Sequence, residues 1–124
     1  MGAGIKSHPK QVNKMIENLT KAGVEIEYRS GAMAYQSNVM PNRAGRFIID
    51  EEASYGAWLH EYRHFIDDKN DGYLGMRVFA DPNKCAQREK NAYELEIRIA
   101  KSYNDDEIID RLTVLMENEV KKYE

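Results

Sequence analysis

His60, Glu61 and His64 form an HExxH sequence, a spacing that is typical of catalytic zinc sites. Two histidines four residues apart lie one turn apart on a helix, so both imidazoles can bind one zinc ion. The glutamate between them is placed to take a proton from a water molecule that the metal activates. The chain has three histidines in all, so this spacing seldom arises by chance. The alternative is a surface helix that carries two histidines and an acid by coincidence.

The motif is predicted to lie on an amphipathic helix from about residue 53 to residue 68. At about 100° per residue, the two histidines and Glu61 share one face with Ala57 and Asp68. The opposite face collects the apolar side chains Tyr55, Trp58, Leu59, Tyr62, Phe65 and Ile66. The HExxH side chains therefore point away from the expected core, towards a cleft or solvent.

A catalytic zinc site needs a third protein ligand, and Glu89 is the best candidate. It lies on a helix predicted to begin at Asp81-Pro82 and to end at about residue 102. Its neighbours on that helix face are apolar or small: Cys85, Ala86, Ala92, Tyr93, Ile97 and Ala100. A carboxylate in such a stripe needs a cation to offset its desolvation. The alternatives are His8 or Cys85 as the ligand, with Glu89 in a buried salt bridge to an arginine.

Three more acids could support the ligands. Glu96 lies one to two turns beyond the expected third ligand. It could be an outer group of the metal site, or it could pair with Arg77 or Arg63. Asp67 and Asp68 follow the motif within one turn, where either could orient a ligand imidazole or simply be solvated at the helix end.

If the metal-activated water attacks a carbonyl group, the site also needs a donor for the oxyanion, and a phenol is well suited to this role. Tyr93 lies one turn from Glu89 on the same helix face, and Tyr73 lies in the loop between the two site helices. Either could be the donor, and plain core packing is the alternative for Tyr93.

The elements around these helices indicate a single α+β domain over residues 1–124. Val24 to Arg29 alternates apolar and polar residues, which predicts a strand. Ser30-Gly31 is a turn signal, so residues 32–36 are expected to form a second strand that makes a hairpin with the first. Three further segments complete the prediction: a helix from Pro9 to about Gly23, a third strand at 46–49, and a last helix that begins near residues 104–106.

Composition excludes several classes of protein. The net charge is −3 and no basic cluster occurs, so we expect no nucleic-acid partner. A lone cysteine excludes an internal disulfide. No apolar run approaches the ~18 residues of a membrane span, and the first residues lack the apolar core of an export signal. We therefore expect a soluble protein that does not bind membranes, whose site of action the sequence leaves unknown.

Three segments together resemble the compact zincin-like metallopeptidases: the strand Phe47–Ile49, the HExxH helix up to Asp68, and Glu89-xx-Ala92-Tyr93-xx-Glu96. The resemblance covers about residues 45–100. It is strongest to the C-terminal toxin modules of bacterial polymorphic toxins and to modules on some phage virion proteins. It implies a minimal zincin-like fold with one zinc ion per chain. It also implies that His60, His64 and Glu89 are the ligands and that Glu61 is the catalytic base.

The resemblance implies a zinc-dependent endopeptidase that acts on a protein or peptide substrate as a toxin or effector domain. A substrate in such folds adds as an extended strand along an exposed sheet edge, for which residues 32–36 are the candidate. A toxin would imply a cognate immunity or inhibitor protein, and delivery within a larger secreted chain to a cytoplasmic target. The alternatives are a non-catalytic, zinc-stabilised binding module and an intracellular regulatory protease that cleaves a repressor.

Many relatives have small or uncharged residues at the two central motif positions, where this chain has Tyr62 and Arg63. Arg63, at the edge of the site face, is expected to affect substrate choice.

Overall fold

The computed structural model describes residues 2–124 and has the α+β architecture that the sequence predicts. Its helical segments are α1 (Gly4–Ser7), α2 (Pro9–Lys21), α3 (Tyr55–Asn70), the 3₁₀ helix η1 (Gly75–Ala80), α4 (Pro82–Ser102) and α5 (Asp106–Lys121). Its strands are β1 (Glu25–Tyr28), β2 (Met33–Gln36) and β3 (Arg46–Ile49). None of the helices in this part of the chain has the length and apolarity that a membrane crossing requires.

Side-chain caps define where α3, α4 and α5 begin. The Ser54 hydroxyl accepts the backbone N–H of Ala57 at the start of α3, at 3.1 Å. Asp81 caps α4 in the same way, followed by Pro82 at the first helical position, and Asp105 caps α5. The caps of α4 and α5 lie where the sequence predicts them. The 3₁₀ helix η1 occupies a segment that was expected to be loop.

The order of the strands differs from the prediction. The sheet order is β1-β3-β2, with β3 parallel to β1 and antiparallel to β2, so β1 and β2 do not form a hairpin. The physical reason lies in β3, whose residues Phe47, Ile48 and Ile49 are all at most 2% exposed. Such a strand is stable in the centre of a sheet, whereas β1 carries Glu25 and Glu27 and suits an edge. The expectation that β2 is an edge strand is correct.

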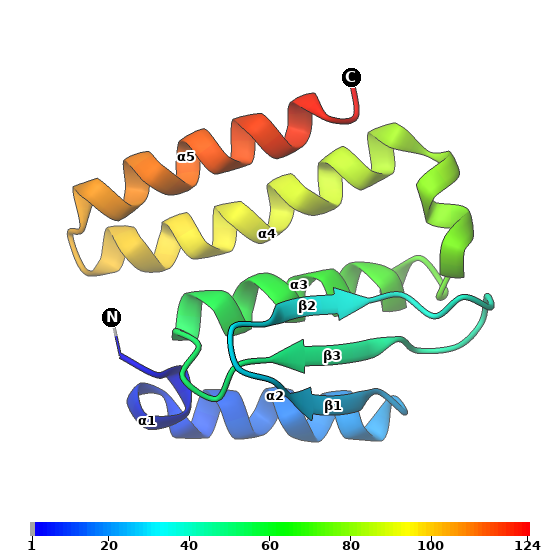
Figure 1. Cartoon of the computed structure of the whole chain (residues 1–124), viewed down its shortest axis with the longest axis horizontal. Helices are drawn as coiled ribbons and strands as arrows, with labels where there is room; N and C mark the ends of the chain where they lie inside the picture. Colours follow the sequence, from blue (N-terminus) through cyan, green and yellow to red (C-terminus); the bar gives the residue numbers. More distant parts are fainter. Residues whose placement is uncertain (1) are drawn as a thin grey trace.

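Helices α2 and α3 pack on one face of the sheet, and α4 and α5 form a pair that lies against α3 (Figure 1). The hydrophobic core joins α2, β3 and α3 through buried side chains, with Val24 at the start of β1: Val12, Met15, Leu19, Val24, Phe47, Ile49, Trp58 and Phe65. Trp58 and Phe65 are 0% and 1% exposed, and their burial fixes the rotation of α3 about its axis. The opposite face of α3 is therefore turned towards α4.

Gly45, just before β3, permits a backbone approach that no other residue would allow. A Cβ atom at this position would lie 1.9 Å from the carbonyl oxygen of Gln36 and 2.9 Å from Cζ of Tyr35.

We therefore expect Gly45→Ala to lower the free energy of unfolding by about 2 kcal/mol, the scale of overpacking in a tight site. Urea unfolding measures this change. Gly2→Ala is the matched control because nothing lies within 4 Å of a Cβ there. Equal stability of the two variants would contradict this packing.

Candidate metal centre

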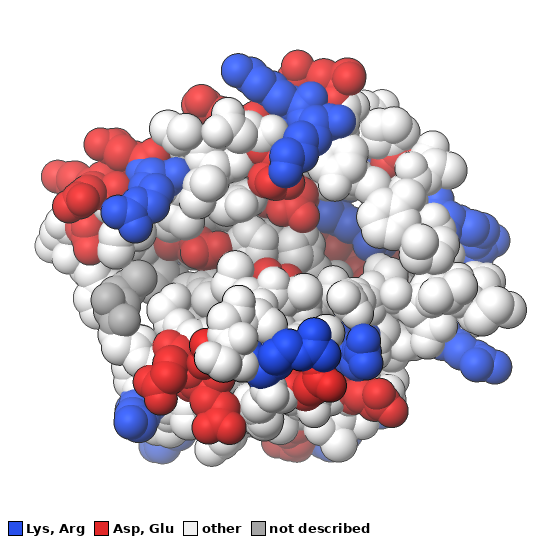
Figure 2. Space-filling view, in the orientation of Figure 1, with Lys and Arg blue, Asp and Glu red and all other residues white. Residues whose placement is uncertain are grey.

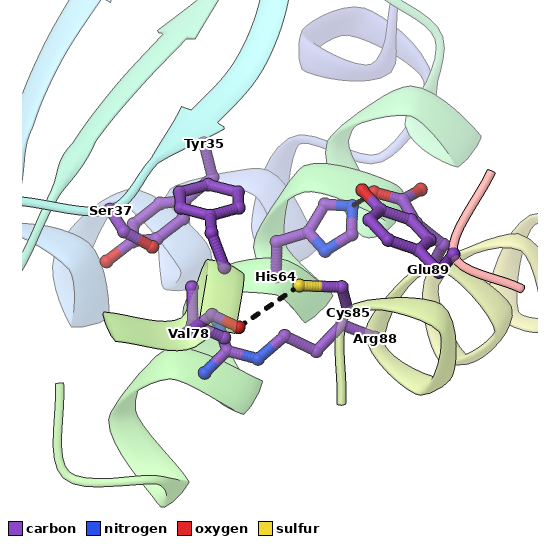
Figure 3. Close-up of a pocket in the computed structure, with 9 residues that line it drawn as sticks. Tyr35, Ser37, His64, Val78, Cys85, Arg88 and Glu89 are labelled. Atoms are coloured by element: carbon purple, nitrogen blue, oxygen red, sulfur yellow. Dashed lines mark hydrogen bonds and ion pairs between the residues drawn. The ribbon is translucent and has the colours of Figure 1, made fainter. Parts of the chain in front are cut away.

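Helices α3 and α4 bring His60, His64 and Glu89 together. One ligand atom from each residue lies within 4.8 Å of the other two. His60 Nε2 is 3.7 Å from Glu89 Oε2, and His64 Nε2 is 3.3 Å from Glu89 Oε1. Two ligands bound at ~2.0–2.1 Å to a tetrahedral zinc ion are themselves ~3.3 Å apart, so these spacings fit one ion. Figure 3 shows the His64 ring directed at the Glu89 carboxylate.

The ligand group is shielded from solvent. The side chains of His60, His64 and Glu89 are 6%, 14% and 22% exposed. Figure 2 shows a hollow between the α4–α5 pair and the sheet, with acidic side chains inside it. The expected rotation of α4 is correct, because Ala92 and Ala100 are fully buried while Lys90, Glu94, Arg98 and Lys101 are exposed.

Negative charge surrounds His60. Its Nδ1 lies 2.5 Å from Glu96 Oε1, and its Nε2 faces the carboxylates of Glu89 and Glu61. Burial alone would lower the pKa of His60, but its close contacts with the carboxylates of Glu89 and Glu96 and the charge of Glu61 raise it to about 10. Burial would raise the pKa of Glu89, but the two histidines lower it to about 2. Without a metal, a proton on His60 supplies the cation that these carboxylates require.

Glu96 lies against the far nitrogen of His60, the position that the predicted role as an outer group of the metal site requires. The alternative partners have other contacts. Arg63 Nε pairs with Asp67 Oδ1 at 3.1 Å, and Arg77 Nε donates to the carbonyl oxygen of Leu74.

Asp67 and Asp68 have partners other than His60 and His64, so the prediction that one of them orients a ligand imidazole is wrong. Asp67 accepts hydrogen bonds from Arg63 and from Asn91 of α4. Asp68, which is 0% exposed, accepts the hydroxyl of Tyr35 at 2.5 Å. The reason is that Nδ1 of His60 faces α4, whereas these two carboxylates point to an arginine and to the sheet.

Glu61 is 6% exposed and lies beside the ligand group. Its Oε1 accepts the backbone N–H of Tyr35 in β2 at 2.9 Å. Its Oε2 is 4.0 Å from Nε2 of His60, close to where a metal would lie. One carboxylate oxygen is thus held by the sheet edge, and the other faces the ligands.

Of the two candidate oxyanion donors, Tyr93 lies at the site. Its ring meets the ring of His60 edge-on, with centroids 4.5 Å apart. Burial and the charge of Glu89 raise the pKa of Tyr93 to about 12, so its phenol keeps its proton near neutral pH. Tyr73 packs against the hydrophobic core instead.

The other candidate ligands have different contacts. His8 stacks on Tyr55 with ring centroids 4.0 Å apart, in a separate part of the fold. The thiol of Cys85 donates to the carbonyl oxygen of Val78 at 3.3 Å, and burial raises its pKa. Cys85 nevertheless lines the same cavity as His64 and Glu89.

Sequence reasoning did not find the residues that reach this cavity from distant parts of the chain. The cavity has a volume of about 100 Å³ and receives Tyr35 and Ser37 from the β2 region and Tyr123 from the C-terminal end. The sequence marked Tyr35 only as part of the strand expected at residues 32–36 and indicated no partner for it on α3. Comparisons with protein-family models, curated proteins and solved structures found no match for this chain.

Glu89 and Glu94 provide a matched pair for testing the third ligand, because both are acids on α4 and only Glu89 faces the histidines. We expect purified Glu89→Ala to lose its zinc and Glu94→Ala to keep one ion per chain, with little change in stability. Metal analysis by mass spectrometry measures the zinc content. Full zinc in Glu89→Ala would exclude Glu89 as a required ligand.

The raised pKa of His60 predicts how pH affects the chelated protein. A histidine whose pKa rises from 6.5 to about 10 on folding adds stability that is complete below pH 6.5 and lost as pH passes 10. We expect the stability difference between the natural chain and His60→Ala, measured by urea unfolding without metal, to shrink between pH 6.5 and 10. Saturating zinc should remove this alkaline loss, since a nitrogen that binds metal carries no proton. A difference that stays constant across this range would contradict the prediction.

Proposed function

We propose that this chain is a zinc-dependent endopeptidase. The observation that carries the proposal is the convergence of His60, His64 and Glu89 within 4.8 Å, with the carboxylate of Glu61 beside them. A zinc ion held by these residues would polarise the scissile carbonyl and lower the pKa of the attacking water. Three protein ligands leave room for water or substrate, which distinguishes a catalytic site from a closed structural one.

The side chains around the ligands have suitable roles in peptide hydrolysis. Glu61 takes a proton from the attacking water and passes it to the leaving amine. Tyr93 keeps its proton and donates a hydrogen bond to the oxyanion. Glu96 fixes the ring of His60 from its far side, at 2.5 Å.

The position of β2 at the edge of the sheet supports a protein or peptide as the substrate. β2 lies at the end of the sheet order and contacts α3. An extended chain can add to such an edge through backbone hydrogen bonds, which places its peptide bonds alongside the HExxH helix. An endopeptidase must bind an extended main chain in order to cleave one of its internal peptide bonds.

The resemblance to polymorphic-toxin and phage-associated modules supports an effector role with a cognate inhibitor, after delivery as part of a larger secreted chain. A regulatory protease that cleaves a repressor is the alternative for the same chemistry. A zinc-stabilised binding module is the alternative without chemistry, because its ligands would be the same and only turnover would differ.

Glu61→Gln tests the catalytic proposal most directly. The amide has nearly the shape of the carboxylate but cannot take a proton, so zinc content should stay at one per chain while turnover falls at least ~100-fold. The measurement is product formation from unfolded casein and a random peptide library, read by mass spectrometry. A chelator should abolish cleavage, and added zinc should restore it.

His60→Ala is the companion variant and should lose metal and turnover together. Turnover by Glu61→Gln equal to that of the natural chain would exclude Glu61 as the base. A zinc-loaded natural chain that cleaves none of these substrates, with any inhibitor removed, would favour the binding module.

A further inference from the structure

Tyr35 joins the edge strand β2 to helix α3 at two points. Its backbone N–H donates to Oε1 of Glu61 at 2.9 Å, and its side-chain hydroxyl donates to Oδ2 of Asp68 at 2.5 Å. Glu61 and Asp68 are seven residues apart, which is two helical turns, so they lie on one face of α3. A single residue of the strand therefore spans two turns of the HExxH helix.

The direction of the Tyr35 backbone follows from the register of the sheet. In an antiparallel pair, successive residues point their N–H and C=O groups alternately towards and away from the partner strand. Ala34 pairs with Ile48 of β3, and the N–H of Tyr35 points the other way, to Glu61. The outer edge of β2 thus places a donor at the expected catalytic base.

The hydroxyl of Tyr35 is fixed by partners on both sides. It accepts the backbone N–H of Gly45 at 2.9 Å while it donates to Asp68, which is fully buried. The ring packs edge-on against Phe65, with centroids 5.9 Å apart, and lies against the hydrophobic core. Burial and the neighbouring Asp68 raise the pKa of Tyr35, so its phenol remains a donor. The position of the Tyr35 side chain is thus set by contacts outside the metal site.

We propose that Tyr35 is a positioning residue for Glu61: the bond from its phenol to Asp68 fixes β2 so that its backbone N–H holds one oxygen of the Glu61 carboxylate. The other oxygen, 4.0 Å from Nε2 of His60, is then left facing the metal ligands. The significance of this arrangement for catalysis rests on the proposed function, since it requires Glu61 to be the base. The placement of Glu61 itself can be measured without turnover.

Hydrogen exchange at the amide of residue 35, resolved by NMR in the zinc-loaded protein, reports whether this N–H is bonded to Glu61. We expect Glu61→Ala to raise the exchange rate at this amide about tenfold, the scale of a lost hydrogen bond to a charged group. The double variant Tyr35→Phe/Asp68→Leu should raise it similarly. Replacing both partners by apolar groups leaves no unpaired buried acid, so this variant should fold even where Tyr35→Phe alone does not.

Two controls separate positioning from a general loss of structure. Asp68→Asn keeps an acceptor for the phenol and should leave exchange at residue 35 within about twofold of the natural chain. Tyr62→Phe also removes a hydroxyl from a half-buried tyrosine, one that accepts from Asn18 at 2.9 Å, but it has no bond to β2. The amide of Ala34 is the internal reference, because a loosened sheet would speed its exchange as well.

Turnover gives the second readout. If the chain is a peptidase, Tyr35→Phe/Asp68→Leu should lose at least ~10-fold in kcat at unchanged zinc content, and Asp68→Asn and Tyr62→Phe should retain activity. Unchanged exchange at residue 35 in the double variant, or a rise shared equally by Ala34, would overturn the proposal. So would unchanged kcat in an active protein. If nothing is cleaved, the proposed function fails, and exchange at residue 35 still decides whether Tyr35 places Glu61.

Discussion

Helix α3 has two buried faces of opposite character, and the rest of the molecule is arranged to satisfy both. Trp58 and Phe65 belong to the hydrophobic core with α2 and β3, and this packing sets the rotation of the helix. Four residues of the other face, His60, Glu61, Asp67 and Asp68, are less than 9% exposed although each is polar or charged. Such groups are stable in the interior only when hydrogen bonds or opposite charges replace the lost water. Helix α4 and strand β2 supply those partners.

Helix α4 and strand β2 supply different kinds of partner, carboxylates from the helix and neutral hydrogen-bonding groups from the strand. From α4, Glu89 and Glu96 place two carboxylates around His60, and Glu61 of α3 adds a third. Three acids around one imidazole leave an excess of negative charge in a region of low dielectric, which favours a bound cation. From β2, Tyr35 offers hydrogen bonds instead of charge. The metal site and the sheet edge therefore meet at Glu61, which contacts both.

The parts of this arrangement that lie along one helix could be predicted from the sequence. Helical periodicity placed His60, Glu61 and His64 on the polar face of α3 and put Glu89 in the apolar stripe of α4. Glu89 could then be chosen over Glu94 without coordinates, because their angular positions on one helix differ by more than a third of a turn.

The parts that depend on pairing between distant segments could not be predicted. The local turn signal at Ser30-Gly31 favoured a hairpin, whereas the burial of Phe47 to Ile49 decides the strand order. Position along α3 alone allowed Asp67 or Asp68 to orient an imidazole, or to be solvated at the helix end. The actual partner of Asp68, Tyr35, is 33 residues away in the chain and has no periodic relation to it.

The α4–α5 pair lies outside the hydrophobic core cluster that joins α2, β3 and α3. The buried core cluster and the side chains packed against it come from the first 73 residues, and none comes from α4 or α5. The face that α4 turns to α3 has small side chains, Ala92 and Ala100, interspersed with Glu89 and Glu96. Small residues bury little apolar area, and the ion pairs between the two helices offset the desolvation of the charges buried there. A metal ion bound by His60, His64 and Glu89 would join α3 directly to α4. Such binding would couple the metal to the docking of α4 through the same three side chains, and it would give the acids in the buried stripe of this helix a cation to pair with.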